Sequence, residues 1–396
     1  MEEWKEYKIE DICEHIFAGG DAAKYSSSKY QTPFYNIPIY ANSTENEGLY
    51  GYCDKAVVSS PAVTIAARGA GIGFVAFRNK PFVPIVRLIT LITNNSVDTK
   101  FLYYYLKNRR LSGDGSAIPQ ITVPMVKKEV VTIPALEEQK RIADILSSFD
   151  AKIELNRRIN DNLEQQAQTL FKSWLVDFDP FKNGKFVESE MGMIPEGWKV
   201  ISLQEYCQEI TRGNIPTYVE KSNRPILNQK VNKGVSLEKQ YYKYNSENVE
   251  VSISKMAHYG DVLLNSLGQG TLGRVHLYKE KLGNVIIDQF ITILRTNLFV
   301  KSAYLSYTLN RPEYQTIIEG NVTGSTGMWV LTINNVRNIK IIVPKESCFL
   351  ELAPIINSIY QAISNNTAEM EQLCTLRDCI LPHLMSGELK INDLNC

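Results

Sequence analysis

Apolar residues recur at alternating steps of four and three in two long stretches of the chain. This spacing places the apolar side chains along one face of a helix and is typical of a coiled-coil seam. The first seam comprises Ile142, Leu146, Phe149, Ile153, Asn156, Asn160, Leu163, Ala167, Leu170 and Trp174. The second seam comprises Leu352, Ile356, Ile359, Ile363, Asn366, Met370, Leu373, Arg377, Ile380 and Leu384. The pattern predicts two long helices, each of which buries its seam against the other.

The two predicted helices differ in the prolines near their ends. A first helix from Leu136 to Trp174 would be roughly 58 Å long, at about 1.5 Å per residue. In the second seam Pro354 lies inside the apolar pattern, and proline is tolerated only in the first turn of a helix. We therefore expect the second helix to begin near Ala353, or to be kinked there, and to end at Pro382.

Both seams carry an asparagine at the same step, Asn156 and Asn366. A buried asparagine lowers stability but fixes the register of a helix pair, because only one alignment satisfies its amide. Alternatively, these steps are partly hydrated and the asparagine is merely tolerated. On the first alternative, Asn156 and Asn366 set the register of the helix pair.

Shorter apolar runs fill the remaining sequence, which is rich in Tyr, Val, Ile, Thr, Gly and Pro. Strand-like runs occur at Val63–Ile65, Gly73–Phe77 and Phe290–Leu294. Short helices are expected at Lys100–Lys107 and Ser302–Leu309. The mixture predicts globular α+β domains.

The chain repeats itself. Trp4-Lys5 matches Trp198-Lys199 at an offset of 194, and Gly115-Ser116 matches Gly324-Ser325 at an offset of 209. Val131 to Pro134 matches Ile341 to Pro344 at an offset of 210, which also relates the two seams. An offset that only grows along the chain indicates a duplication with small insertions in the second copy.

The predicted organisation is therefore globule, helix, globule, helix. Residues 1–134 form the first globular domain and 135–176 the first helix. Residues 177–346 hold a linker and the second globular domain, and 347–396 the second helix with a C-terminal tail. The expected fold is α+β, with two similar domains separated by two long antiparallel coiled-coil helices in a pseudo-twofold internal repeat.

Charge is segregated along the 396 residues, although 43 basic and 43 acidic side chains give a net charge of zero. The net charge is +2 for residues 1–134, −3 for 135–190, +5 for 191–346 and −4 for 347–396. Both globules are positive and both helical segments are negative. Such a chain should bind nucleic acid only weakly by itself.

The composition argues against three classes of protein: membrane-spanning, disulfide-rich and zinc-cluster proteins. No apolar run reaches the roughly 20 residues that span a bilayer, so we expect no membrane segment. Seven cysteines, an odd count with no CxxC pair, imply neither a disulfide framework nor a zinc cluster. We therefore expect a cytoplasmic protein.

The one nucleotide-like motif lacks the right context. Residues 268–273 match GxGxxG, but a dinucleotide site needs a helix after the glycines. The residues that follow, 274–278, alternate like a strand. A glycine-rich turn between two strands is the better interpretation, and the sequence shows no catalytic or metal-ligating constellation.

Polar residues near the glycine turns suit DNA contact instead. Arg pairs with guanine and Asn or Gln with adenine, while Lys mostly contacts phosphate. For each single residue, a solvated surface role is the alternative, and Trp329 could equally belong to the core. The candidate DNA-binding residues are Arg68, Ser116, Gln120, Lys127, Arg212, Asn228, Lys230, Gln269, Arg274, Ser325, Trp329 and Asn334.

Four segments carry a resemblance to a known family. They are Ile133–Leu146 (IPALEEQKRIADIL), Leu163–Trp174 with Phe178–Phe181, Gly192–Trp198 (GMIPEGW) and Leu384–Leu389 (LMSGEL). In these segments, and over nearly its whole length, the chain resembles the specificity subunit of type I restriction–modification enzymes. Lys345–Leu350 departs from the family's usual Leu-Glu-Glu-Gln pattern, which puts the start of the second helix in doubt.

The resemblance implies that each globule reads one half of a split, asymmetric site in double-stranded DNA. It implies that the helices set the gap between the half-sites and dock two modification subunits, which methylate adenine. A restriction subunit, the motor-nuclease, would join them. The chain itself would be non-catalytic and hold no cofactor, with S-adenosylmethionine, ATP and magnesium on the partner subunits.

Two rival classes remain. A single-chain adenine methyltransferase or nuclease would need its own cofactor site, and both a strand-turn-helix glycine loop and the (Asp/Asn/Ser)-Pro-Pro-(Tyr/Phe) tetrapeptide are missing from the sequence. A structural coiled-coil scaffold would show no salt-dependent binding to DNA.

Overall fold

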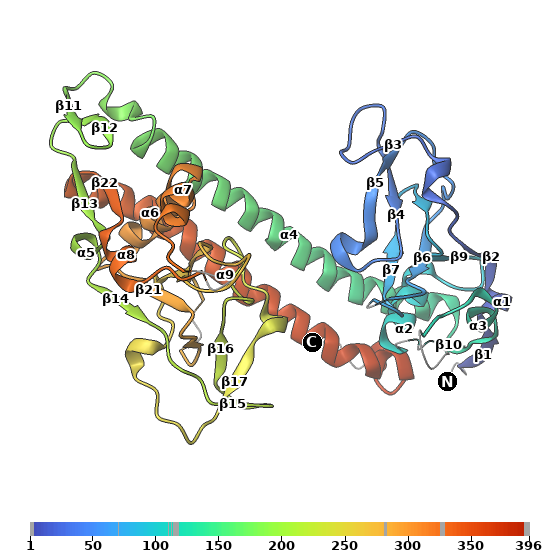
Figure 1. Cartoon of the computed structure of the whole chain (residues 1–396). Helices are drawn as coiled ribbons and strands as arrows, with labels where there is room; N and C mark the ends of the chain where they lie inside the picture. Colours follow the sequence, from blue (N-terminus) through green and yellow to red (C-terminus); the bar gives the residue numbers. More distant parts are fainter. Residues whose placement is uncertain are drawn as a thin grey trace. The chain divides into compact units, whose positions relative to one another are not determined.

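The computed structural model describes residues 4–69, 71–109, 111, 113, 119–280, 283–324 and 329–391 (Figure 1). The chain divides into two compact units. Unit 1 comprises Met1–Leu155 and Glu369–Cys396, and unit 2 comprises Asn156–Ala368. Both boundaries fall inside the long helices, α4 (Leu136–Leu175) and α9 (Glu346–Ser386). Each unit therefore combines one globular region with parts of both helices.

The globular region of unit 1 is built on two four-stranded sheets and a strand pair. The first sheet has the order β2-β9-β6-β7 and is antiparallel throughout, the second has the order β3-β5-β4-β8 with β4 and β8 parallel, and β1 pairs with β10. The strands are β1 (Lys5–Lys8), β2 (Cys13–Ala18), β3 (Ser27–Ser28), β4 (Ile37–Tyr40), β5 (Leu49–Cys53), β6 (Ala62–Ile65), β7 (Val75–Arg78), β8 (Val83–Pro84), β9 (Ile89–Thr93) and β10 (Val130–Ile133). The helices are α1 (Ile9–Ile12), α2 (Thr99–Arg109) and α3 (Val123–Lys128).

Unit 2 repeats this topology strand for strand. Its sheets have the orders β14-β21-β18-β19 and β15-β17-β16-β20, again with one parallel pair, and β13 pairs with β22. The strands are β13 (Lys199–Ser202), β14 (Glu209–Arg212), β15 (Tyr218–Val219), β16 (Pro225–Leu227), β17 (Lys243–Asn245), β18 (Val262–Asn265), β19 (Val275–Leu277), β20 (Ile286–Ile287), β21 (Ile291–Arg295) and β22 (Lys340–Val343). The helices are α5 (Leu203–Tyr206), α6 (Phe299–Leu309), α7 (Pro312–Gly320) and α8 (Ile333–Asn338). The predicted duplication is confirmed.

A small hairpin lies in the segment between α4 and the globular region of unit 2. It consists of β11 (Phe186–Ser189) and β12 (Gly192–Pro195), which pair antiparallel. Phe178, three residues after the end of α4, and Phe181 both contact the ring of Trp198 edge-on. These aromatic contacts fix the path of the linker against unit 2.

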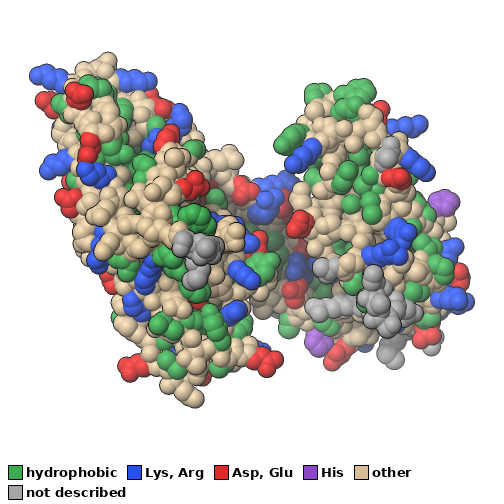
Figure 2. All heavy atoms as spheres, in the orientation of Figure 1, with side chains coloured by type: hydrophobic (Ala, Val, Ile, Leu, Met, Phe, Trp, Pro, Cys, Tyr) green, Lys and Arg blue, Asp and Glu red, His purple; other side chains and the backbone are tan. Residues whose placement is uncertain are grey.

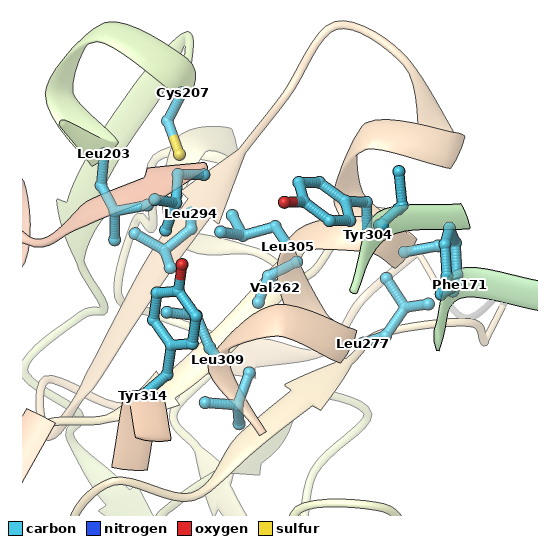
Figure 3. Close-up of a cluster of buried hydrophobic side chains, with 14 of the residues drawn as sticks. Phe171, Leu203, Cys207, Val262, Leu277, Leu294, Tyr304, Leu305, Leu309 and Tyr314 are labelled. Atoms are coloured by element: carbon cyan, nitrogen blue, oxygen red, sulfur yellow. The ribbon is translucent and has the colours of Figure 1, made fainter. Parts of the chain in front are cut away.

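The long helices share the hydrophobic core of each globular region. In unit 2, Phe171 of α4 and Phe349 of α9 are fully buried in the same cluster as Leu305 of α6. Figure 3 shows Phe171 beside Tyr304, with Leu305 and Leu309 in the same cluster. In unit 1, Leu146 of α4 and Leu384 of α9 are buried with Phe101 of α2. The helices are therefore structural parts of each unit rather than free connectors.

The two helices run antiparallel in both units. In unit 1, Asp150 pairs with Arg377 and Lys152 with Glu369. In unit 2, Asn160 is bonded to Asn366 and Glu164 to Tyr360, so partner numbers fall along α9 as they rise along α4. All twenty predicted seam positions are buried or half-buried, which confirms the two seams.

The expected start of the second helix near Ala353 and its expected end at Pro382 are wrong. α9 begins at Glu346 and continues through Pro354 and Pro382 to Ser386. Each proline removes one backbone hydrogen bond to the carbonyl four residues earlier, here that of Leu350 or Asp378. Both prolines and both carbonyl-bearing residues are exposed, so water can bond these carbonyls, and the buried face of the helix keeps its packing.

Candidate DNA interface

Arg68 and Gln120 lie together at the glycine-rich turn of unit 1. The Arg68 guanidinium donates to Oε1 of Gln120, through Nε at 2.8 Å and also through Nη2. The two residues are brought together because Ile121 N–H bonds the Ala67 carbonyl at 3.0 Å. Arg68 remains exposed, so the Gln120 amide holds a solvent-facing guanidinium in one orientation.

Asn42 supports the same turn, a role that no pattern in the sequence indicates. Its Oδ1 accepts from the backbone N–H of Ala67 and Arg68, and its Nδ2 donates to the Arg68 carbonyl at 2.7 Å. One side chain therefore bonds three backbone groups beside Arg68. A turn held in this way presents its side chains with little loss of entropy on binding.

In unit 2 the glycine-rich turn and Trp329 line one pocket of about 450 Å³. The turn lies beside the segment around Val330, which forms isolated antiparallel bridges with Leu267 and Thr323. Trp329 is 50% exposed, so it belongs to the surface and not to the core. The remaining lining residues are Gly268, Gln269, Gly270, Leu272, Glu319 and Val322.

The GxGxxG segment of unit 2 connects two antiparallel strands, β18 and β19. Gly268, Gly270 and Gly273 all have positive φ, which favours glycine. No helix follows the glycines, because Val275 already begins β19. This geometry is a strand-to-strand turn and lacks the helix N-terminus of a dinucleotide site.

Two of the predicted arginines of unit 2 bond to the backbone. Arg274 donates to the carbonyls of Gly270 at 3.0 Å and Asn232 at 3.4 Å, and so supports the glycine turn. Arg212 donates through Nη2 to the Leu331 carbonyl. Burial lowers the pKa of the Arg212 guanidinium, and its Nη1 is a buried donor with no hydrogen-bond partner among the described residues.

Asn228 and Lys230 are neighbours with different surroundings. Asn228 is buried, with its Nδ2 bonded to the Tyr241 carbonyl at 3.0 Å and its Oδ1 to the Lys230 N–H at 2.8 Å. Its amide shapes the backbone at this point. Lys230 is exposed and free to reach outward, while the exposed Gln269 lies on the glycine turn.

Lys127 and Asn334 occupy equivalent short helices, α3 and α8. Both residues are exposed. Each helix begins at a threonine cap, because Thr122 Oγ1 accepts from Met125 N–H and Thr332 Oγ1 from Asn335 N–H. Ser116 and Ser325, which were also predicted to contact DNA, lie outside the described residues.

Asn366, one of the two predicted register asparagines, bonds an asparagine of the other helix. Asn366 Nδ2 donates to Asn160 Oδ1 at 2.9 Å, and Asn160 Nδ2 lies 3.3 Å from Thr367 Oγ1. Asn156 is 1% exposed. The cross-helix partner of Asn366 is therefore the seam residue one turn beyond Asn156, namely Asn160.

Comparison with known proteins places this arrangement in a family. A family model described as the type I restriction modification DNA specificity domain matches residues 1–165. The type I restriction enzyme MjaIX specificity subunit of Methanocaldococcus jannaschii is 27% identical over 424 residues, covering 99% of this chain and 95% of that protein. The C-terminal part of a putative type I specificity subunit from Mycoplasma pneumoniae is 32% identical over 114 residues, which are 28% of this chain and 78% of that sequence.

The chain belongs to the type I restriction–modification specificity-subunit family. Among solved structures, the S subunit of a type I restriction–modification system from M. genitalium superposes with a TM-score of 0.59 at 18% identity. The match covers 97% of this chain and 96% of that one, which shows a common fold.

Basic residues are scattered over the surface of this family member. On the described part of the face drawn in Figure 2, Lys and Arg side chains are spread over both globular regions, among acidic and uncharged side chains. Among the described residues, no group of three or more His, Cys, Asp and Glu side chains could hold a metal ion. Within that same part of the chain, no helix has both the length and the apolar composition that a membrane crossing requires.

Proposed function

We propose that this chain is the DNA-recognition subunit of a type I restriction–modification complex, in which each globular region reads one half of a bipartite, asymmetric site. We call these regions recognition domains 1 and 2, in units 1 and 2. One observation carries the proposal. The two units have the same strand order, but their glycine-rich turns, between β6 and β7 and between β18 and β19, present different side chains. One backbone thus presents two different sets of hydrogen-bonding groups.

Exposed residues at the turns supply the base contacts. In recognition domain 1 the Arg68–Gln120 pair offers guanidinium donors of the kind that read guanine. In recognition domain 2 the exposed Trp329 and Gln269 line the open pocket at the equivalent turn. Lys127 and Lys230 contact phosphate. Asn228, Arg212 and Arg274 support the backbone behind these residues.

The helix pair sets the spacer and docks two modification subunits. The chain catalyses nothing itself and holds no cofactor, so S-adenosylmethionine, ATP and magnesium belong to the modification and restriction subunits. The acidic helical segments and mildly basic domains fit a subunit that binds DNA firmly only with its partners. We expect the complex to act in the cytoplasm, where its DNA substrate lies.

The test is an exchange of one complete unit. Residues 1–155 and 369–396 are replaced together by those of another family member, because α4 and α9 contribute buried residues to that core. Genome-wide adenine methylation in cells that also express the modification subunits should then show one changed half-site and one retained half-site. A change in both halves, or methylation without a bipartite motif, would contradict the proposal.

Two further measurements address the remaining parts of the proposal. Deleting one heptad from each helix should shorten the spacer and leave both half-sites unchanged.

The isolated chain should bind no S-adenosylmethionine in calorimetry, whereas the rival single-chain methyltransferase would bind it.

A further inference from the structure

Each recognition domain is tied to the helix pair by a three-residue polar junction. In unit 1 the Tyr104 hydroxyl of α2 donates to Asp150 Oδ2 of α4 at 2.6 Å, and Arg377 of α9 donates to the other oxygen of Asp150. The Asp150 carboxylate therefore makes a domain-to-helix contact and a helix-to-helix contact at once. We call this arrangement junction 1.

Junction 2 has the same logic in unit 2. Glu164 of α4 accepts from Lys279 Nζ of recognition domain 2 at 3.0 Å and from the Tyr360 hydroxyl of α9 at 3.0 Å. The Lys279 ammonium also lies 5.5 Å from the centre of the Tyr360 ring. In both junctions, one carboxylate on α4 joins a donor on α9 to a donor on the domain.

The two junctions are not copies of each other. At the repeat offset of 210, the residue equivalent to Asp150 is Tyr360, and Arg377 is equivalent to Ala167. Different residues therefore build the same three-way arrangement in the two units. A requirement for the arrangement itself explains this better than inheritance from the duplicated ancestor.

The surroundings explain what the junctions add to the shared hydrophobic core. Tyr104 is 2% exposed and Tyr360 4%, so both hydroxyls bond in a largely buried site. Tyr104 and Asp150 line a pocket of about 310 Å³ between the domain and α4 in unit 1, and junction 2 lines one of about 370 Å³ between the domain and both helices in unit 2. Apolar packing is incomplete there, and apolar burial is non-directional, whereas a hydrogen bond to a carboxylate prescribes distance and angle.

We infer that the two junctions fix the orientation of each recognition domain on the helix pair, and thereby the number of base pairs between the half-sites that the enzyme accepts. The inference rests on the proposed function. One base pair more or less displaces a half-site by about 3.4 Å along the duplex and by roughly 35° around it. The shared hydrophobic core still limits how far a domain without its junction can tilt, but the loss of the directional bond lowers the free-energy cost of following part of that displacement.

The test removes only the bonds that join each domain to α4, which are Tyr104–Asp150 and Lys279–Glu164. Tyr104→Phe removes one hydroxyl and leaves Asp150 paired with Arg377, and Lys279→Met leaves Glu164 bonded to Tyr360. The double variant is expressed with the modification subunits, and methylation is mapped genome-wide. Methylation at sites with a spacer one base pair longer or shorter should rise about tenfold relative to the original spacer, as expected for a loss equivalent to one charged hydrogen bond. The bases of both half-sites should stay unchanged.

A matched control carries the same substitutions away from the helices. In Tyr105→Phe/Lys239→Met, the lost groups bond within their own domains, to the Thr132 N–H at 3.1 Å and to Glu280 at 3.2 Å. This control should keep the original spacer. An unchanged spacer in the junction variant, or equal relaxation in the control, would overturn the inference.

Single variants keep the test decisive if the double variant assembles poorly. Tyr104→Phe alone and Lys279→Met alone should each relax the spacer about threefold, which is half the double-variant effect on a logarithmic scale. If both single variants assemble and keep the wild-type spacer, the inference fails. If the complex with the wild-type chain methylated no bipartite DNA motif, that result would instead contradict the proposed function.

Discussion

The two recognition domains agree where the backbone packs on itself and differ where side chains face solvent. Gly19 and Gly213, 194 residues apart, both lie against the backbone at the end of a neighbouring strand, β8 or β20. At the glycine-rich turns, by contrast, Arg68 and Gln120 in unit 1 correspond to Leu267 and Val330 in unit 2. The comparison distinguishes residues that stabilise the common fold from residues that differ between the two domains. Only the residues that differ can recognise different DNA bases.

The largest expected effect tests the shared scaffold. A Cβ at Gly19 would lie 2.6 Å from the Pro84 carbonyl carbon, and one at Gly213 would be closer still to the Asp288 carbonyl oxygen. Because backbone cannot yield as a side chain can, Gly19→Ala should destabilise unit 1, and Gly213→Ala unit 2, by about 3 kcal/mol each. Hydrogen exchange followed separately in each unit measures this.

The adjacent glycine supplies the control for that experiment. Nothing lies within 4 Å of a Cβ at Gly20, so Gly20→Ala should change the stability of unit 1 by less than about 0.5 kcal/mol. Equal losses for Gly19→Ala and Gly20→Ala would show that the close backbone approach is not the cause.

A smaller effect distinguishes the two units by pH. His276 of β19 is fully buried with Nδ1 donating to the Gly234 carbonyl at 2.7 Å, whereas the equivalent position in β7 is Ala76. Burial, aided by the Lys279 charge, lowers the pKa of His276 to about 3 from 6.5. A base whose pKa is lower in the folded state stabilises above pH 6.5, and that stability is lost as the pH falls towards 3.

As the pH falls from 7.5 to 5, the contribution of His276 to the free energy of unfolding of unit 2 should decrease by about 2 kcal/mol. His276→Ala gives unit 2 the residue of unit 1 and should remove this part of the pH dependence, whatever it does to stability at pH 7.5. Urea unfolding followed by hydrogen exchange at both pH values checks the difference. An unchanged pH dependence in the variant would mean that folding does not lower the pKa of His276.

The smallest effect concerns the surfaces that differ. Arg68→Ala should weaken discrimination in one half-site only, and Trp329→Ala in the other, by about 1 kcal/mol per affected base pair. Binding of the assembled complex to DNA duplexes with single substitutions measures this loss. If either variant altered both half-sites, the assignment of one domain to one half-site would be wrong.

The periodic parts of this structure follow from sequence because their causes are local. Side chains at steps of four and three share a helix face whatever lies nearby, so both seams and both long helices were predicted. The bounds of α9 were not, because a proline in a helix interior is tolerated when the freed carbonyl meets water. Exposure of Leu350 and Asp378 is decided by the tertiary fold and has no local signature.

The candidate site shows the same division. The glycine turns were recognisable from spacing and from the strand pattern after them. Whether a polar residue near a turn faces outward, as Lys230 does, or bonds the backbone, as Asn228 does, depends on which carbonyl the fold places beside it. The partner of Asn366, Asn160, likewise depends on the register of the two helices. The seams show which face of each helix is buried, but they do not show which residues of the two helices lie opposite each other.

The unit boundaries have a consequence for heredity. Unit 2 is one continuous stretch, 156–368, whereas unit 1 is assembled from both outer portions, 1–155 and 369–396. In a gene for this protein, two crossovers inside the helix-coding segments would transfer unit 2 as a single cassette with its own packing intact. A lone crossover would instead pair the N-terminal portion of unit 1 with a C-terminal portion of different parentage, so that buried residues such as Leu146 and Leu384 would come from different ancestors. New specificities should therefore spread more readily by insertion of the middle of the gene than by exchange of one end.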